Sequence, residues 1–330
     1  MRKKIFIWCS DIQKNNGEGV LANKFITDLK RYNKNYSFKI MTLSSGYTKF
    51  FRNIFGNIAD RFLFPFLGIL YLWFVFIFKK KKKICYVNYL PLWNFILFII
   101  LPPKTILGPI TGGSKYLKKP YLNYYLRQII LNFFCILSIQ ILRFRQNKLL
   151  CSTDLLKYKF NNFKKIKFNY VFKDFKFVDK NQNRKFDIIF YLRSHKNKNT
   201  HLNIYLANNL SKKFNVITIG EKIKNKNIVN MGNINKKDLY NILQKTKYSL
   251  LSAENIYSFF GLDCLSNGVH VFYHNASKPL VNLKKNMTPV NYYRQDLVKK
   301  LLEKKLKKRF QKQKKIIFKN NKDFSKYFII

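Results

Sequence analysis

The chain has 330 residues, with 64 Lys and Arg against 15 Asp and Glu, and a formal net charge of +49. Its length exceeds the roughly 100–200 residues of a usual single domain, so we expect two domains. Apolar residues make up 47% of the sequence, enough to form large cores, and this argues against a disordered protein.

Three explanations of the positive charge compete. Nucleic-acid binding would gather basic residues on one element, but the sequence has no zinc-finger, helix-turn-helix or RNA-binding signature, so we expect no nucleic-acid partner. An anionic membrane would attract basic clusters that lie beside apolar stretches. A coding bias towards Lys, Asn and Ile would spread Lys along the whole chain, as is observed. The membrane and the coding bias both remain open.

The cysteines and the N-terminus bear on the compartment. Five cysteines without a CxxC pair indicate buried free thiols in a reducing compartment. The N-terminal sequence MRKKIFIWCSDIQ has an apolar run of only five residues, which is too short for the core of a signal peptide. The sequence therefore predicts a cytoplasmic location.

The first elements in chain order are those of an α/β unit. Ile5–Cys9 is an apolar run typical of a buried strand, and a polar loop containing Gly17 follows it. Apolar residues at helical spacing from Val20 to Leu29 predict a helix, and Phe38–Leu43 predicts a second strand. A strand, a loop, a helix and a strand in this order begin a parallel sheet.

The segment Phe62–Phe78 is ambiguous, with 17 uncharged positions between Arg61 and the run Lys79–Lys83. A membrane span needs about 20 apolar residues, with a range of roughly 17–25, and the Lys run would suit a cytoplasmic flank. A span here would place two halves of one sheet on opposite sides of a bilayer. We therefore favour a helix that does not span, buried at the edge of a domain or in contact with a membrane surface; a true span is the alternative.

The rest of the first half continues the α/β pattern. We expect a short apolar helix over 94–103, a long helix over 121–144, and strands at 84–90, 104–110 and 147–153. Residues 157–185 are rich in Lys, Asn and Phe without a clear period, and we interpret them as the crossing between domains.

A second alternation of strands and helices runs from 186 to 274, and a basic helix follows at 297–314. We predict an α/β protein of two Rossmann-like domains facing a cleft, at 1–165 and 180–300, with a basic helical tail at 301–330. Ligands of such sheets bind beyond the carboxyl ends of the strands.

The stretch LLSAENIYSFFGLDCLSNGVHVF, residues 250–272, places two acidic residues between apolar runs. Ser258 is a predicted N-cap for a helix that ends near Gly268. Free amides at the start of that helix, near Phe260 and Gly261, would suit a phosphate group. The alternative is that this stretch is an ordinary loop and helix.

The two acidic residues of the stretch would serve hydroxyl groups. Glu254 would follow the carboxyl end of a strand, where its carboxylate could accept hydrogen bonds from a hexose. Asp263 would lie in the second turn of the helix and could accept hydrogen bonds from a ribose.

These residues resemble the donor-binding domain of glycosyltransferase family 4, which has the GT-B fold. That family has two Glu separated by seven residues, with Gly five positions after the second. Here Asp263 lies five residues before Gly268, and Glu254 lies nine before Asp263, so one extra residue intervenes. Arg193 and Lys198, in YLRSHKNKN, match the spacing of an Arg and a Lys that the family has after an earlier strand.

The resemblance is less specific in the first half. Gly17, in NNGEGVLANKFITDL, matches the family's N-terminal Gly loop, and a close approach to the diphosphate or acceptor is implied there. Gly112 and Gly113, in LGPITGG, match a Gly-Gly loop of some members and would line the acceptor side of the cleft. Simple turn glycines are the alternative at all three positions.

The resemblance implies a retaining transfer of sugar from a nucleotide-sugar donor to a glycan or lipid-linked acceptor, as in assembly of cell-surface polysaccharide or lipopolysaccharide. Arg193 and Lys198 would neutralise the diphosphate, since charge develops on it as the glycosidic bond breaks. Glu254 would hold the sugar, and Asp263 with Ser258, Phe260, Gly261 and Gly17 would bind the rest of the donor. The enzyme would lie at the inner face of the membrane.

Two departures from the family pattern matter. All four His residues lie in the second half of the chain, whereas many relatives have one in the first domain near the donor sugar. The second acidic residue is Asp, at a shifted spacing. A catalytically degenerate GT-B protein that acts as a scaffold or binding partner in a polysaccharide-assembly complex is therefore the alternative function. No Asp-x-Asp pair occurs, so we expect no metal and no cofactor.

Overall fold

The computed structural model describes most of the chain. The described residues are 3–10, 12, 17–43, 45–56, 59–79, 82–87, 90–113, 122–146, 148–160, 166–167, 174–178, 184–194, 198–253, 255–279, 284, 286–310 and 315–319. They form two compact units. The N-terminal unit contains the described residues up to Gly113 and from 122 to 167. The C-terminal unit contains the described residues from 174 to 319.

The N-terminal unit is built on a parallel sheet of four strands in the order β2-β1-β3-β4. The strands are β1 (Lys3–Trp8), β2 (Tyr36–Met41), β3 (Lys82–Tyr86) and β4 (Ile106–Leu107). A second pair, β5 (Leu149–Leu150) and β6 (Ile166–Lys167), is also parallel. The Ile110 amide donates to the Leu150 carbonyl at 2.7 Å, which joins this pair to the segment after β4.

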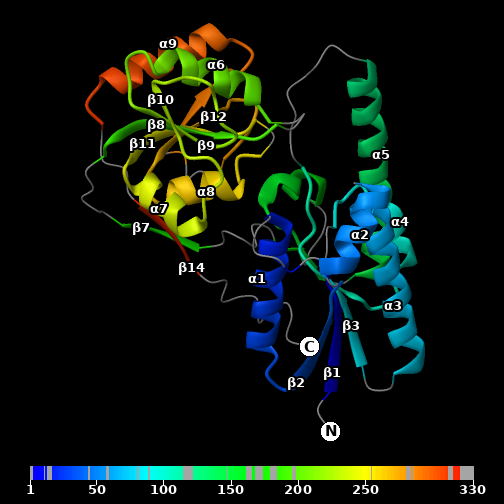
Figure 1. Cartoon of the computed structure of the whole chain (residues 1–330). Helices are drawn as coiled ribbons and strands as arrows, with labels where there is room; N and C mark the ends of the chain where they lie inside the picture. Colours follow the sequence, from blue (N-terminus) through cyan, green and yellow to red (C-terminus); the bar gives the residue numbers. More distant parts are fainter. Residues whose placement is uncertain are drawn as a thin grey trace. The chain divides into compact units, whose positions relative to one another are not determined.

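Helices cover both faces of that sheet, because successive side chains of a strand point to opposite faces. Ile5 and Ile7 pack with α1 (Gly17–Tyr32), whereas Phe6 and Trp8 belong to the core formed with the helices of the other face. Those helices are α3 (Phe64–Phe78), α4 (Phe95–Ile100) and α5 (Leu122–Arg145). Two shorter elements, α2 (Ser45–Phe55) and η1 (Ala59–Leu63), precede α3 in the chain. Figure 1 labels α2, α3, α4 and α5.

Helix α3 lies within the ambiguous apolar segment, and it is a core helix on one side. Ile69, Leu72 and Val75 are buried in the core that includes β1 and β3. A Cβ on Gly68 would lie 2.1 Å from Trp8 Nε1, so the helix approaches β1 closely at this glycine. This packing agrees with the helix that we favoured from the sequence, buried on one side at the edge of a domain, and the span at Phe62–Phe78 stays an alternative prediction.

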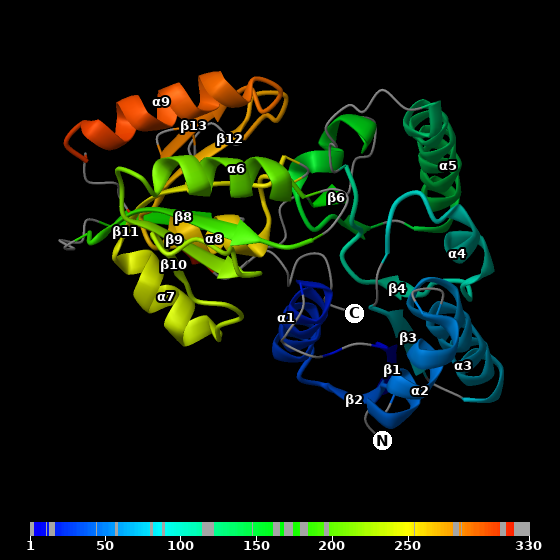
Figure 2. The same cartoon turned by 45° about the horizontal axis from the view of Figure 1, so that its top comes forward.

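The C-terminal unit has a parallel sheet of six strands in the order β10-β9-β8-β11-β12-β13. The strands are β8 (Phe186–Leu192), β9 (Val216–Gly220), β10 (Ile228–Asn230), β11 (Thr246–Leu250), β12 (His270–His274) and β13 (Met287–Val290). Its helices are α6 (Thr200–Leu210), α7 (Lys236–Gln244), α8 (Phe259–Ser266) and α9 (Gln295–Lys307). Figure 2 shows α6 and α9 on one side of the sheet and α7 and α8 on the other.

Two segments differ from the sequence-based expectation. The basic helix expected at 297–314, outside the two domains in part, is α9, which buries Val298, Leu302 and Leu306 in the core shared with α6. Its three apolar residues recur every four positions, so Lys occupies only the outer face. The segment expected to be an irregular crossing contains β7 (Asp174–Val178), which pairs antiparallel with β14 (Lys315–Lys319).

All five cysteines are free, as predicted, and all except Cys135 are buried. Burial raises the pKa of the Cys85, Cys151 and Cys264 thiols, which keeps them protonated at neutral pH.

Candidate functional site

The candidate site lies at the carboxyl edge of the six-stranded sheet, between β8 and β11. From β8 the chain adds β9 and β10 on one side, and from β11 it adds β12 and β13 on the other. The strand order therefore reverses between these two neighbours. In open parallel sheets, ligands bind in the crevice at such a switch point. The described residues that emerge there are 193–194 and 198–199 after β8, and 251–253 and 255–258 after β11.

The second of these loops leads into α8, which begins as the sequence predicts. The Ser258 Oγ accepts a hydrogen bond from the Gly261 amide at 3.2 Å, so Ser258 is the N-cap. This bond engages the Gly261 amide within the cap, and its contact with a phosphate stays a prediction. Gly261 itself is buried, and a Cβ there would lie 3.0 Å from Leu251 Cδ2. Little room is therefore left for a side chain at this position.

An aromatic pair joins the two loops. The rings of Tyr191, near the end of β8, and Phe260, in the first turn of α8, lie 5.4 Å apart between centroids. The end of β8 and the start of α8 therefore lie side by side. Phe260 was expected to offer only its amide, and Tyr191 was not singled out in the sequence.

The loop after β8 is held at both ends. The Thr200 Oγ1 donates to the Arg193 carbonyl at 2.5 Å, which ties the loop to the start of α6. The Ser194 Oγ donates to Glu221 Oε2 at 2.5 Å, and the Ser194 amide donates to the same carboxylate, just after β9. These bonds lower the pKa of Glu221. The Arg193 side chain remains exposed beside this fixed backbone.

Polar groups at the start of α6 add donors to this edge. Lys198 is partly buried, and the next residue, Asn199, is the N-cap residue with 7% exposure. Within the described part of the chain, the Asn199 Nδ2 has no hydrogen-bond partner, and neither has the Ser252 Oγ after β11. A buried amide donor without a partner is costly, so a ligand oxygen at this edge would relieve that cost.

Asp263 faces α7. Its Oδ1 accepts a hydrogen bond from the Tyr240 hydroxyl at 2.9 Å and lies 3.6 Å from Lys236 Nζ. Burial raises the pKa of Asp263, and the charge of Lys236 and the Tyr240 bond oppose that rise. One carboxylate oxygen is thus already engaged within the unit, and a ribose contact by Asp263 stays a prediction.

Four predicted site residues remain, Glu254 and three glycines of the N-terminal unit. Glu254 lies outside the described residues. Gly17, the exposed first residue of α1, belongs to the N-terminal unit with Gly112 and Gly113. Gly112 has a φ of 136° and Gly113 a φ of 74°, and a Cβ on Gly113 would lie 2.6 Å from the Leu155 carbonyl oxygen. Backbone geometry explains this Gly pair, and an acceptor-side role for it is untested.

The described residues contain no group of three or more His, Cys, Asp or Glu side chains that could hold a metal ion. The His270 Nε2 lies 2.8 Å from the Thr288 Oγ1, and the His274 Nδ1 lies 3.4 Å from the Val290 carbonyl oxygen. These contacts join β12 to β13, as expected for structural histidines.

No protein-family model matches the sequence, and no curated protein matches it. Solved structures match nearly the whole chain. The UDP-GlcNAc 2-epimerase of Methanocaldococcus jannaschii, in complex with UDP-GlcNAc and UDP, has a TM-score of 0.55 at 11% identity and covers 98% of this chain and 97% of its own. TarM has a TM-score of 0.59 at 10% identity, covering 99% and 94%. A glycosyltransferase from Rickettsia africae ESF-5 has 0.50 at 12%, covering 92% and 88%.

The chain has the GT-B fold. The expectation of an α/β protein with two Rossmann-like domains is confirmed. At these identities the likeness establishes the fold alone, and the reaction has to be argued from the site.

Proposed function

We propose that this GT-B protein is a glycosyltransferase that moves a sugar from a nucleotide-sugar donor to a glycan or lipid-linked acceptor, with retention at the anomeric carbon. One observation carries the proposal: the exposed Arg193 follows β8 at the switch point, where the Tyr191–Phe260 contact brings the start of α8 alongside. A cation and a helix N-terminus at one edge are suited to a diphosphate.

The proposed roles follow from charge. Arg193 and Lys198 neutralise the diphosphate and stabilise the charge that grows on it as the bond to the sugar breaks. The amide of Phe260 and the side chains of Asn199 and Ser252 supply further donors. Glu254 orients the sugar, and Asp263 binds the ribose. The leaving phosphate accepts the proton of the acceptor hydroxyl, so the proposal needs no metal, no cofactor and no separate general base.

We propose that the sugar donor is a uridine diphosphate sugar. This rests on the ligands of a structure with the same fold, the epimerase with UDP-GlcNAc and UDP. The acceptor side is proposed to lie at the inner face of a membrane, in assembly of a cell-surface polysaccharide such as lipopolysaccharide.

A ligand-stability experiment tests donor binding. A ligand at 100 times its dissociation constant stabilises a protein by about 2.7 kcal/mol. UDP and UDP-sugars are therefore expected to raise the melting temperature of the full chain. Arg193→Ala should abolish the rise, whereas Arg309→Ala, which removes an exposed Arg beyond α9, should keep it. A rise that is unchanged in Arg193→Ala would contradict the site.

A product experiment tests the reaction. Release of UDP from the sugar nucleotide, with and without crude lipid or glycan acceptors, is compared between the unchanged chain and Glu254→Gln. If the protein transfers sugar, a sugar–acceptor product should form, and Glu254→Gln should lower the rate of UDP release by about 100-fold or more. Equal rates would favour the scaffold function. Conversion of UDP-GlcNAc to its C2 epimer, without transfer, would replace the transferase by an epimerase.

A further inference from the structure

An unusually apolar outer surface covers one helical layer of the N-terminal unit. The layer is formed by α2, α3, α4 and α5, and α3, α4 and α5 share one core with Phe6 and Trp8 of the sheet. On α3, large apolar side chains are exposed at 66, 70, 74 and 77, a spacing that places them on one stripe. On α5, the exposed residues 122, 126, 129, 133 and 136 form a second stripe. Soluble monomers rarely expose apolar surface on this scale.

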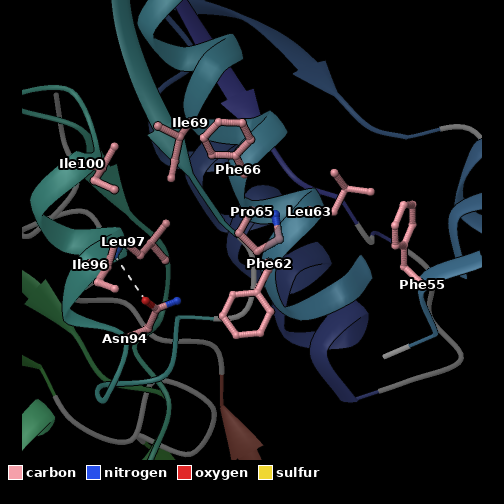
Figure 3. Close-up of a pocket in the computed structure, with 10 residues that line it drawn as sticks. All are labelled: Phe55, Phe62, Leu63, Pro65, Phe66, Ile69, Asn94, Ile96, Leu97 and Ile100. Atoms are coloured by element: carbon pink, nitrogen blue, oxygen red, sulfur yellow. Dashed lines mark hydrogen bonds between the residues drawn. The ribbon is translucent and has the colours of Figure 1, made fainter. Parts of the chain in front are cut away.

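A groove opens within this layer. Its volume is about 430 Å³, and nine apolar side chains and Asn94 line it. Phe62, Phe66 and Ile69 form one wall, from η1 and α3, and Ile96, Leu97 and Ile100 of α4 form the other (Figure 3). The Asn94 Oδ1 accepts from the Leu97 amide at 3.3 Å, so it caps α4. The groove therefore has the chemistry of a hydrocarbon site.

The charge around this layer identifies its partner. Residues 45–145 contain 15 Lys and Arg but only one acidic residue, Asp60. Two copies of this chain that met through the apolar surface would bring two strongly positive segments together, and like charges at an interface disfavour association. An anionic lipid surface offers the opposite charge beside hydrocarbon.

The layer can lie in a membrane without crossing it. Among the described residues, α5 is the one helix long and apolar enough to span, and its window Gln128–Arg145 is only 17% buried. Its C-terminal end is fixed in the unit, because Arg145 Nη1 donates to the Phe98 carbonyl at 2.6 Å and its other nitrogen to the Leu101 carbonyl.

We propose that the outer face of α3 and α4, extended by α5, inserts into the headgroup and acyl-chain boundary of an anionic phospholipid bilayer, and that the groove between η1–α3 and α4 receives a lipid acyl chain. Interfacial insertion of an apolar helical face flanked by Lys and Arg is a known form of membrane binding. The inference rests on the peripheral location in the proposed function, and it is independent of the transfer reaction.

Vesicle flotation tests the surface. The full chain is expected to float with vesicles of phosphatidylcholine and phosphatidylglycerol, and less with phosphatidylcholine alone. The variant Phe66→Gln/Ile77→Gln/Ile96→Gln changes side chains that are at least half exposed, and it should lower the bound fraction at least tenfold. The matched control Val229→Gln/Met231→Gln/Leu297→Gln changes exposed apolar residues of the C-terminal unit and should bind like the unchanged chain. Equal binding by the first variant and the unchanged chain would overturn the proposal.

Quenching by brominated lipids tests insertion in the unchanged protein, so the proposal stays falsifiable if the variant fails to fold. All three Trp lie in the N-terminal unit, and the Trp73 Nε1 of α3 donates to the Ile100 carbonyl of α4 at 2.7 Å. Acyl chains that carry bromine should quench Trp fluorescence. Flotation without quenching would mean headgroup attraction alone and would overturn the insertion.

Two further measurements, of dimer formation and of the melting temperature with UDP, distinguish lipid binding from dimerisation and from failure of the proposed function. A chain that fails to float but forms dimers that the first variant abolishes would assign the face to a second copy and overturn the lipid proposal. The rise in melting temperature with UDP should be the same in both triple variants. Failure of nucleotide binding in the unchanged chain would therefore contradict the proposed function and leave the vesicle result standing.

Discussion

The rings of Tyr191 and Phe260 lie 5.4 Å apart, with 31° between their planes, and they join the end of β8 to the first turn of α8. Each residue precedes a part of the proposed donor site: Tyr191 lies two residues before Arg193, and Phe260 three before Asp263. The pair therefore lies between the strand end that carries the proposed diphosphate cation and the helix that would carry the ribose contact.

A double-mutant cycle should detect this coupling. Tyr191→Ala and Phe260→Ala each remove a partly exposed ring, and aromatic pairs contribute about 0.5–1.5 kcal/mol beyond the area they bury. The double variant should lose less stability than the two single losses added together, by that amount, in urea unfolding. Additive losses would show that the rings are neighbours without energetic coupling.

Arg184 should be essential to the stability of the C-terminal unit. Its guanidinium donates to four backbone carbonyls. One is in the last turn of α7, one is at the start of β11, and two lie just after α8: those of Leu243, Thr246, Asn267 and Gly268. Burial lowers its pKa to about 10, so it is charged at neutral pH. The ammonium group of a Lys is one point charge and cannot bond to all four carbonyls. We therefore expect Arg184→Lys to lower the free energy of unfolding by about 2–4 kcal/mol.

The control for that loss is Arg309→Lys, at an exposed position, which should change stability by less than about 0.5 kcal/mol. Hydrogen exchange should locate the loss of protection in β8, β11 and β12. A loss confined to the N-terminal unit would refute the role of Arg184.

Features with a short sequence range were predictable, and those with a long range were not. Ser258 was predicted as an N-cap because a cap and its helix lie within four residues, and the structure confirms it. The partners of Arg184 lie 59 to 84 residues away, so no local pattern indicates them. The same holds for Ser194 and Glu221, which are 27 residues apart. In α9 the apolar period was present, but the many Lys residues hid it.

Asp263 should give the stability a specific dependence on pH. Its pKa is raised above 3.8 in the folded chain, so the folded state holds this proton more tightly than the unfolded state. Its contribution to stability is therefore lost as the pH rises through the interval from 3.8 to the raised value. Asp263→Asn has no such proton, so its stability relative to the unchanged chain should increase with pH over that interval.

Urea unfolding at a series of pH values from about 4 to 8 measures this difference. Tyr240→Phe removes a hydrogen bond that lowers the pKa of Asp263, and it should widen the interval. A stability difference between Asp263→Asn and the unchanged chain that does not vary with pH would contradict the raised pKa.

Gly113→Ala should destabilise the N-terminal unit. The φ of 74° is unfavourable for a residue with a Cβ, and the added atom would meet the Leu155 carbonyl oxygen at 2.6 Å, a backbone atom that cannot rotate away. We expect a loss of about 1–3 kcal/mol. The matched control is Gly46→Ala in α2, where a Cβ meets nothing within 4 Å and Ala should stabilise the helix by up to about 1 kcal/mol. Trp fluorescence during urea unfolding measures the stability of this unit in both variants, because all three Trp lie in it. Equal effects of the two substitutions would show that neither the φ of Gly113 nor its approach to Leu155 requires a glycine at this position.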